Sequence, residues 1–335
     1  SKASTDFTDL SPRQIKLASS LPFELTDDQK KIIATINAEI DSSCKDAIKF
    51  HENQDEFSEN AKPFTLSRLI QGDVGSGKTL VAFFAALRII DWGGQCVILS
   101  PTELLARQHA ENATKLLSPL GINPSFLTGN IKAKGRNQLL NSIKNGETQL
   151  IIGTHALFSK NVQYKNLQLA IVDEQHRFGV IQRNFIKEKC SIPNILMMSA
   201  TPIPRSLAII LYGDMDISTL KTLPRGRLPI KTYALDYSMY DRICKWILRI
   251  VAEGQQVYMV YPLIEEGEDT NLRSVTERFA SLSNGVFKGI SCGVLHGKMT
   301  PQQKESVMRD FKEGKVQILF STTVVEVGVD VPNAS

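Results

Sequence analysis

At 335 residues the chain is long enough for two domains, and its 42% hydrophobic and 22% charged residues are typical of a globular protein rather than a disordered or fibrous one. No apolar run reaches the roughly 20 residues of a membrane-spanning helix, so we expect no membrane partner. The net charge of +4 permits nucleic-acid binding without arguing for it, and the five cysteines, none in a C-x-x-C pair, indicate free thiols in a reducing, cytoplasmic environment.

The amino-terminal region is expected to contain a tail, a helix and an insertion. Residues 1–20 are polar and weakly periodic, which predicts a tail or linker. Thr26 is a good N-cap for a helix over 27–40 with isoleucines along one face. Gln29 lies in its first turn, where an amide suits an adenine edge, although a surface glutamine explains the spacing equally well. Residues 41–63 are acidic and poor in large apolar side chains, which predicts a solvated, mobile insertion.

A phosphate-binding loop is the strongest motif. The sequence Q-G-D-V-G-S-G-K-T at 71–79 fits G-x-x-x-x-G-K-[ST], with an apolar strand before it and an amphipathic helix after it. Backbone N–H groups of such a loop surround phosphate oxygens at a helix N-terminus, the lysine reaches the β- and γ-phosphates, and the threonine hydroxyl holds Mg²⁺. We therefore expect ATP and Mg²⁺ as cofactors, bound by the loop residues Gly72, Gly75, Ser76, Gly77, Lys78 and Thr79.

Strand and helix patterns alternate after this loop. Strands are predicted at 96–100, 124–128, 150–154, 169–174, 195–200 and 217–220, and helices at 103–117, 136–145, 182–189 and 205–212. Nearly continuous apolar strands are typical of a parallel sheet that is buried on both faces. The pattern predicts a doubly wound α/β domain over 21–221, with its chemistry at the carboxyl ends of the strands.

A second alternating series follows a linker at 222–229 that is rich in Pro, Gly and Arg. Strands are predicted at 230–235, 256–261, 290–295 and 316–321, and helices at 240–252, 272–283 and 301–312. Because the chain stops a few residues after a strand, we expect 230–335 to be an incomplete second α/β domain.

The apolar strand predicted at 169–174 ends in two carboxylates, which are the first two residues of the sequence D-E-Q-H at 173–176. Asp173 is placed to hold Mg²⁺ together with Thr79, and Glu174 to polarise an attacking water. His176 is a candidate reporter to the second domain, with a structural histidine as the alternative.

The order of these and further motifs resembles a superfamily 2 helicase motor. The motifs are F-x-L-T-x-x-Q, G-D-V-G-S-G-K-T, P-T-E-L-L-A-R-Q-H, G-T-H-A, D-E-Q-H-R-F-G-V, S-A-T-P-I-P-R, H-G-K-M and T-T-V-V-E-V-G-V-D-V-P. More narrowly, they resemble the RecG family of bacterial ATP-dependent branched-DNA helicases. The resemblance implies two RecA-like domains of the P-loop NTPase class and a monomeric motor that remodels stalled forks and recombination junctions.

The resemblance also implies site residues that the spacing alone does not. Gly328 and Asp330 would face the nucleotide. Hydroxyls, backbone N–H groups and helix N-termini bind phosphates without reading sequence, as a motor requires. The implied DNA contacts are Pro101, Thr102, Glu103, Thr128, Gly129, Thr154, His155, His296, Gly297, Thr322 and Thr323.

The chain departs from the family pattern in one respect that bears on activity. The arginine-finger motif Q-x-x-G-R-x-G-R is absent, and Arg225 and Arg227 lie in the linker instead. We therefore expect this chain to be truncated at both ends. Because a transition-state arginine contributes on the order of 10³–10⁵ in rate, we also expect the chain to bind ATP but to hydrolyse it slowly. The alternatives are a transcription-repair coupling translocase, which has a similar motor, and a non-catalytic remnant that binds nucleotide or DNA.

Overall fold

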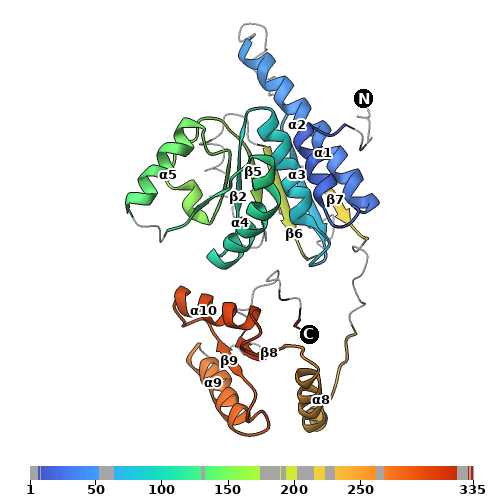
Figure 1. Cartoon of the computed structure of the whole chain (residues 1–335), viewed down its shortest axis with the longest axis vertical. Helices are drawn as coiled ribbons and strands as arrows, with labels where there is room; N and C mark the ends of the chain where they lie inside the picture. Colours follow the sequence, from blue (N-terminus) through green and yellow to red (C-terminus); the bar gives the residue numbers. More distant parts are fainter. Residues whose placement is uncertain are drawn as a thin grey trace. The chain divides into compact units, whose positions relative to one another are not determined.

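The computed structural model describes residues 7, 9–52, 64–129, 133–173, 189, 194–201, 215–222, 231–261, 268–322, 331 and 333–334. The chain divides into two compact units, residues 1–227 and 228–335, and each is described by itself (Figure 1). Of the helix predicted at 182–189 only residue 189 is described, and the helix predicted at 205–212 and the linker from 223 onward lie outside the described residues.

A seven-stranded parallel sheet forms the centre of the first unit, and its strands follow the order β3-β4-β2-β5-β6-β1-β7. The predicted strands are found within about two residues of their expected bounds, so the predicted α/β fold with parallel sheets is confirmed. The strands are β1 (Ser67–Gly72), β2 (Gln95–Leu99), β3 (Ser125–Leu127), β4 (Leu150–Gly153), β5 (Leu167–Val172), β6 (Asn194–Ser199) and β7 (Asp216–Leu220).

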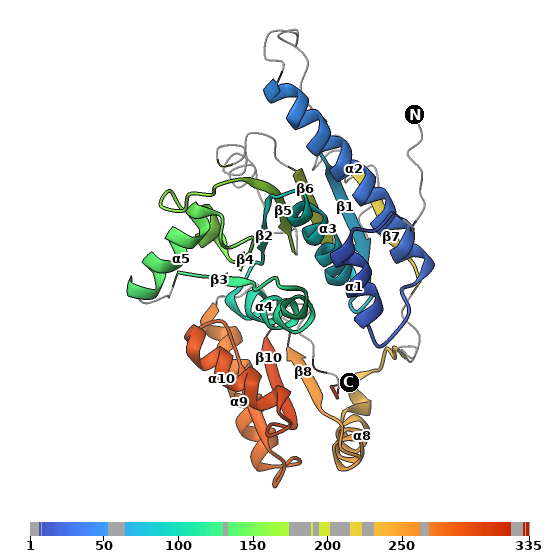
Figure 2. The same cartoon turned by 45° about the horizontal axis from the view of Figure 1, so that its top comes forward.

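Both faces of this sheet are buried, which explains the continuous apolar runs. Neighbouring residues of a strand point to opposite faces, so Leu69 of β1 belongs to one core and Ile70 to the other. The core that contains Ile70 is shared with α3 and with the carboxyl end of α4. Both helices are labelled in Figure 2. The helical segments that follow the strands are α3 (Lys78–Asp91), α4 (Glu103–Leu117), η1 (Ser118–Leu120), α5 (Ala133–Asn145) and η2 (His155–Phe158).

The prediction of a tail over residues 1–20 is wrong for its second half, which forms helix α1 (Pro12–Ser20). Ser11 and Gln14 make a reciprocal capping box, and Gln14 is fully buried. Its Nε2 also donates to Oδ1 of Asn37 at 2.9 Å and to the carbonyl oxygen of Phe84 at 2.8 Å. These hydrogen bonds attach α1 to α2 and α3. The polar composition of the segment does not predict these contacts.

Helix α2 (Asp27–Glu52) also differs from the prediction, because it continues well beyond residue 40. The predicted mobile insertion at 41–63 is therefore wrong for residues 41–52, and 53–63 lie outside the described residues. Asp41 accepts hydrogen bonds from the guanidinium of Arg88 and from the indole N–H of Trp92, at 2.8 and 2.7 Å. Cys44 is buried one turn later, and burial raises the pKa of its thiol to about 12. These contacts hold the acidic half of the helix on α3.

The second unit contains a three-stranded parallel sheet in the order β8-β10-β9. The described elements are η4 (Tyr237–Met239), α8 (Tyr240–Ala252), β8 (Val257–Tyr261), α9 (Glu268–Asn284), β9 (Cys292–Leu295), α10 (Pro301–Lys312) and β10 (Ile318–Thr322).

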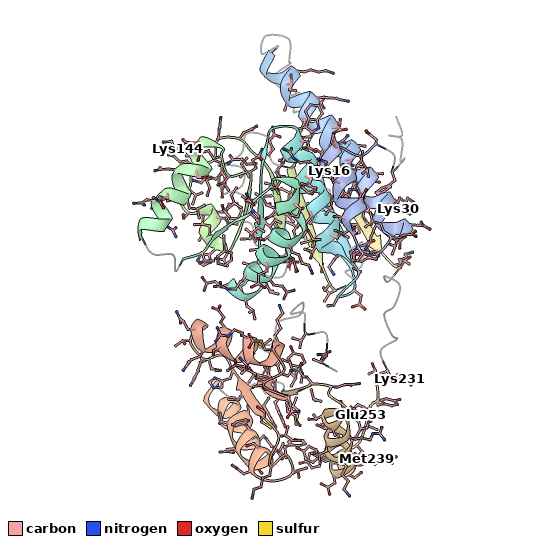
Figure 3. The ribbon with its side chains drawn as sticks, in the orientation of Figure 1. Lys16, Lys30, Lys144, Lys231, Met239 and Glu253 are labelled. Carbon is pink, nitrogen blue, oxygen red and sulfur yellow. The ribbon has the colours of Figure 1, made fainter. Side chains whose placement is uncertain are left out.

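The strand predicted at 230–235 is wrong for residues 231–235, which are exposed and form no strand (Lys231 is labelled in Figure 3). Alternation of apolar residues favours a strand, but a strand forms only where its backbone groups find a partner. None of the described strands pairs with this segment. Over the described parts of both units, no helix has the length and apolar content needed to cross a bilayer.

Candidate functional site

The loops that follow the seven parallel strands meet at the carboxyl edge of the first sheet. Because the strand order is known, the order of these loops along the edge is known as well. The loop after β1 lies between those after β6 and β7, and Asp173 follows β5, one strand beyond β6. The predicted DNA contacts follow β2, β4 and β3, on the opposite half of the edge. The edge is thus divided into two halves, with Asp173 between them.

The predicted phosphate loop connects β1 to α3 in the conformation that its glycines permit. Gly75 and Gly77 have φ angles of 77° and 88°, in the left-handed region that side chains disfavour. Gly77 is the N-cap of α3 and provides no side-chain cap, so the first N–H groups of the helix face the loop. A Cβ on Gly72 would stand 2.6 Å from Oγ of Ser76. A loop that lets backbone N–H groups come close to a ligand at a helix N-terminus suits the binding of an anion such as phosphate.

Lys78 reaches back over this loop. Its Nζ donates to the carbonyl oxygens of Gly72 at 2.7 Å and Asp73 at 2.9 Å. The side chain is 9% exposed, and Thr79 is half-buried in the next position of α3. The hydroxyl of Ser76 is buried without a hydrogen-bond partner in the described structure, which leaves a polar atom in the loop for a ligand to satisfy. The loop therefore has the donors, charge and unsatisfied polarity that a nucleotide phosphate needs.

Gln29 contacts the same loop from α2. It occupies the third helical position, where its Oε1 accepts from the N–H of Thr26 at 2.9 Å, and its Nε2 donates to the carbonyl oxygen of Ser76 at 2.9 Å. Only 1% of the residue is exposed. The surface glutamine that sequence spacing allowed is thus excluded, and its amide holds the phosphate loop in this structure.

Asp173 is held by a residue that sequence reasoning missed. Its backbone N–H donates to the carbonyl oxygen of Leu99 at 2.8 Å, and its Oδ2 lies 2.5 Å from Nε2 of His109 on α4. His109 stands four residues after Leu105 and four before Ala113, on the buried face of α4. That helical spacing was the available signal. The described residues contain no cluster of three or more histidine, cysteine or carboxylate ligands. One carboxylate and one hydroxyl suit Mg²⁺, which takes its other ligands from phosphates and water.

Five of the predicted site residues fall outside the described residues: Glu174, His176, Thr323, Gly328 and Asp330. Of the S-A-T-P-I-P-R motif, Ser199 ends β6 and Ala200 and Thr201 follow it, while the residues from 202 onward lie outside the described residues. The hydroxyl oxygens of Ser199 and Thr201 lie 3.1 Å apart in a local turn.

The predicted DNA contacts of the first unit gather at the half of the edge formed by β3, β4 and β2. Thr102 caps α4, and Thr154 is the N-cap of η2. The carbonyl oxygen of Thr128 accepts from Nη1 of Arg136 at 2.9 Å. Gly129 and His155 are exposed, and Thr128 and Thr154 are buried. The half-buried members of the set are Pro101, Thr102 and Glu103.

In the second unit, His296 follows β9 and Thr322 is the last residue of β10, and these two strands pair with each other. The register that joins Ser321 to Leu295 places the ends of β10 and β9 together. Burial, followed by the nearby charge of Lys304, holds the pKa of His296 below its ordinary value, and its neutral form is favoured. Gly297 is exposed, and Thr322 is 3% exposed.

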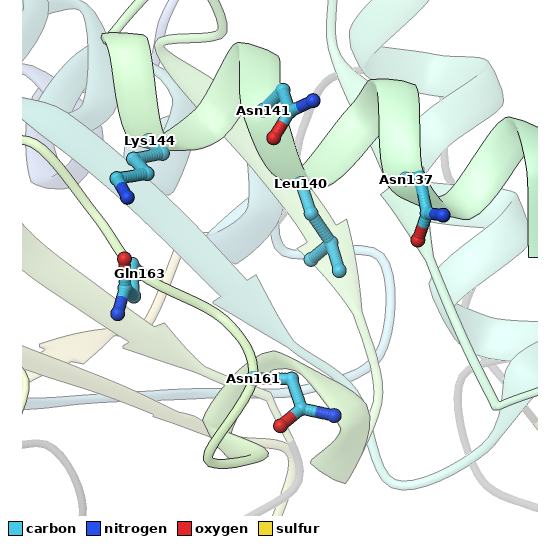
Figure 4. A pocket seen from close by; sticks show the side chains of 6 residues that line it. All are labelled: Asn137, Leu140, Asn141, Lys144, Asn161 and Gln163. Carbon is cyan, nitrogen blue, oxygen red and sulfur yellow. The ribbon is translucent and has the colours of Figure 1, made fainter.

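A separate surface pocket of about 470 Å³ lies between α5 and the segment after η2 (Figure 4). Apart from Leu140, its lining is amide and amine groups, and it contains no carboxylate or histidine. It does not include any predicted site residue. The lining residues are Asn137, Leu140, Asn141, Lys144, Asn161 and Gln163.

Comparison with known families decides which proteins share this arrangement. Residues 26–210, more than half of the chain, match the model of the DEAD/DEAH box helicases. The chain belongs to the DEAD/DEAH box helicase family. Residues 239–335 of this helicase-family chain match the helicase conserved C-terminal domain.

Individual relatives show which group of helicases this chain resembles. The chain is 47% identical to the ATP-dependent DNA helicase RecG of Treponema pallidum over 98% of this chain, and 44% identical to that of Borreliella burgdorferi over 96%. It spans 46% and 44% of those two proteins, less than half of their length. The predicted resemblance to RecG-type helicases is confirmed.

Solved structures give the same result. A structure of RecG bound to a three-way DNA junction is 35% identical, with a TM-score of 0.74, and the match covers 96% of this chain and 39% of that one. Dbp5 of S. cerevisiae, bound to RNA and ADP BeF3, has a TM-score of 0.66 at 17% identity over 99% of this chain and 79% of that one. The latter likeness concerns the fold alone.

Proposed function

We propose that this chain is the motor portion of a RecG-type ATP-dependent DNA helicase. It would act as a monomer in the cytoplasm and remodel branched DNA such as stalled forks and recombination junctions during repair and recombination. The observation that carries the proposal is the divided carboxyl edge, with a phosphate-type loop on one half and the residues predicted to contact DNA on the other. The relatives named RecG, and the structure of one on a three-way junction, support branched DNA as the substrate.

ATP is expected to bind at the loop before α3. The backbone N–H groups at Gly75, Ser76 and Gly77 would surround its phosphates, and the ammonium of Lys78 would exchange two loop carbonyls for phosphate oxygens. The amide of Gln29 already donates to the carbonyl oxygen of Ser76. To contact adenine as well, it would have to bind the loop and the base together or exchange one for the other. Gly328 and Asp330 are proposed to complete the nucleotide site.

Thr79 and Asp173 are the residues that would hold Mg²⁺. When bound, the ion would neutralise negative charge that develops on the phosphates. Glu174 is proposed to orient and deprotonate the attacking water, and His176 to connect that carboxylate to the second unit. A strand end that presents two adjacent carboxylates suits this division of labour.

DNA is expected to lie along the other half of the edge. Thr102 and Thr154 sit at the amino ends of helical segments, where hydroxyl and N–H groups can bind backbone phosphates of any sequence. His296 and Thr322 would supply the equivalent contacts from the second unit, with Thr323 and Gly297 beside them. Contacts of this kind allow a motor to step along DNA regardless of sequence.

The test measures nucleotide binding, DNA binding and ATP hydrolysis by residues 1–335 and by the Lys78→Ala variant. We expect nucleotide binding that Lys78→Ala abolishes, and tighter binding to a model replication fork than to a linear duplex of equal length. Equal affinity for fork and duplex would refute branched DNA as the substrate and favour a duplex translocase. Nucleotide binding that survives Lys78→Ala would refute the assigned ATP site.

A further inference from the structure

The contact between His109 and Asp173 joins two elements that are far apart in the sequence. Nε2 of His109 and Oδ2 of Asp173 are 2.5 Å apart, and the two side chains are 6% and 12% exposed. A carboxylate can only accept a hydrogen bond, so His109 is the donor through Nε2. The contact ties α4 to the end of β5, and α4 begins at the loop that carries the predicted DNA contacts.

Core packing does not explain His109. Its neighbours on the buried face of α4 are Leu105, Ala106, Ala113 and Leu117, so an apolar residue would suit the position. The other ring nitrogen, Nδ1, is buried and has no hydrogen-bond partner in the described structure. A buried polar atom without a partner costs on the order of 1–3 kcal/mol. The fold therefore tolerates an unsatisfied nitrogen at this position in order to present Nε2 to Asp173.

We infer that His109 is a positioning residue for the metal-binding carboxylate. By donating to Oδ2, it fixes the rotation of the Asp173 side chain and hence the direction of Oδ1, the oxygen left for Mg²⁺. Hydrogen bonds to metal-ligating side chains have this effect in general, and their loss weakens metal binding by roughly 10–100-fold. The inference rests on the proposed function, because it takes Asp173 to be a Mg²⁺ ligand.

The test is the Mg²⁺ dependence of nucleotide binding in residues 1–335. A fluorescent, non-hydrolysable ATP analogue is titrated at a series of Mg²⁺ concentrations and in EDTA. His109→Leu removes the donor and keeps the size of the side chain. His109→Gln is the matched control, because its amide nitrogen can occupy the place of Nε2.

We expect His109→Leu to raise the half-saturating Mg²⁺ concentration by roughly 10–100-fold while binding in EDTA stays unchanged, and His109→Gln to restore it to within a few-fold of the original protein. If the leucine variant does not fold, His109→Asn replaces it, because that shorter amide does not reach Asp173.

Three negative outcomes differ in meaning. A Mg²⁺ dependence that is present in the original protein and unchanged in His109→Leu would overturn the inference alone. Nucleotide binding that is independent of Mg²⁺ in the original protein would refute the metal assignment of the proposed function and the inference with it. If His109→Leu lost the same amount of nucleotide affinity in EDTA and in Mg²⁺, His109 would support only the fold, which also overturns the inference.

Discussion

Gln29 connects the first turn of α2 to the phosphate loop, through a 2.9 Å hydrogen bond from its Nε2 to the carbonyl oxygen of Ser76. The same side chain caps its own helix through Oε1, so one residue performs two separable tasks. A Cβ on Gly77 would come within 2.3 Å of Nε2 of Gln29, so a larger loop residue there would displace this amide.

Substitution of Gln29 tests both contacts. Gln29→Glu keeps the capping oxygen but turns a buried carboxylate oxygen toward the carbonyl oxygen of Ser76, so we expect lower thermal stability. Nucleotide binding should weaken by at least about fivefold, the equivalent of one lost hydrogen bond of about 1 kcal/mol. Gln29→Ala should lose both contacts. Nucleotide titration and thermal unfolding measure the two effects, and Gln29→Glu with undiminished affinity would show that the loop does not depend on this bond.

Asp28 anchors the chain where it leaves β7. Its Oδ2 accepts from the backbone N–H groups of Lys221 and Thr222, at 3.0 and 2.9 Å, and from the hydroxyl of Thr222 at 2.9 Å. These hydrogen bonds, chiefly those from Thr222, hold the pKa of Asp28 below its ordinary value of 3.8. The charged carboxylate therefore stabilises the native state above about pH 3.8, and this contribution is lost as the pH falls through the lower, native-state pKa.

We expect Asp28→Ala to lower the melting temperature at pH 7, because three donors lose their acceptor. The difference from the original protein should shrink as the pH falls from about 3.8 through the lower, native-state pKa, below which the carboxylate is protonated in both folded and unfolded chains. Asp27→Ala, at an exposed position in the same turn, is the control for loss of charge at the helix N-terminus. A difference for Asp28→Ala that does not vary with pH would contradict the assigned role of the charge.

Asp41 neutralises Arg88, which is 9% exposed, and its hydrogen bond is the chief cause that raises the pKa of that guanidinium. Asp41→Ala leaves the cation with Asp9 as its nearby carboxylate. We expect a loss of about 3 kcal/mol in the free energy of unfolding, as for a buried pair that loses one partner. Denaturant unfolding measures it, with Lys45→Ala at an exposed position of α2 as the control. Equal stability of the two variants would show that α2 does not need this pair.

Gly153 lies where β4 approaches β3. A Cβ there would come within 2.0 Å of the carbonyl oxygen of Leu127, which belongs to backbone and cannot turn aside. We expect Gly153→Ala to cost about 3 kcal/mol in the free energy of unfolding, at the upper end for an overpacked site. Gly129→Ala is the matched control, because a Cβ at Gly129 meets nothing within 4 Å. Similar melting temperatures for the two variants would refute the close approach.

The sequence by itself determined the elements whose signals are local. The apolar runs of β1 to β7 and the cap at Thr26 depend on neighbouring residues, and α4, α8 and α10 begin and end at the predicted residues. The phosphate loop is equally local, because its glycines, Lys78 and the following helix are consecutive. Short-range periodicity and turn chemistry suffice for such features.

Only the tertiary structure decided the features whose partners are distant in the chain. From the sequence, Asp41 belongs to a predicted acidic insertion. In the structure it is neutralised by Arg88, which lies 47 residues later in the chain. His109 and Asp173 are separated by 64 residues, and no pattern in either segment predicts their contact. The sheet order brings α4 and β5 together, because long-range packing fixes which strand ends are neighbours, and local propensity carries no information about that choice.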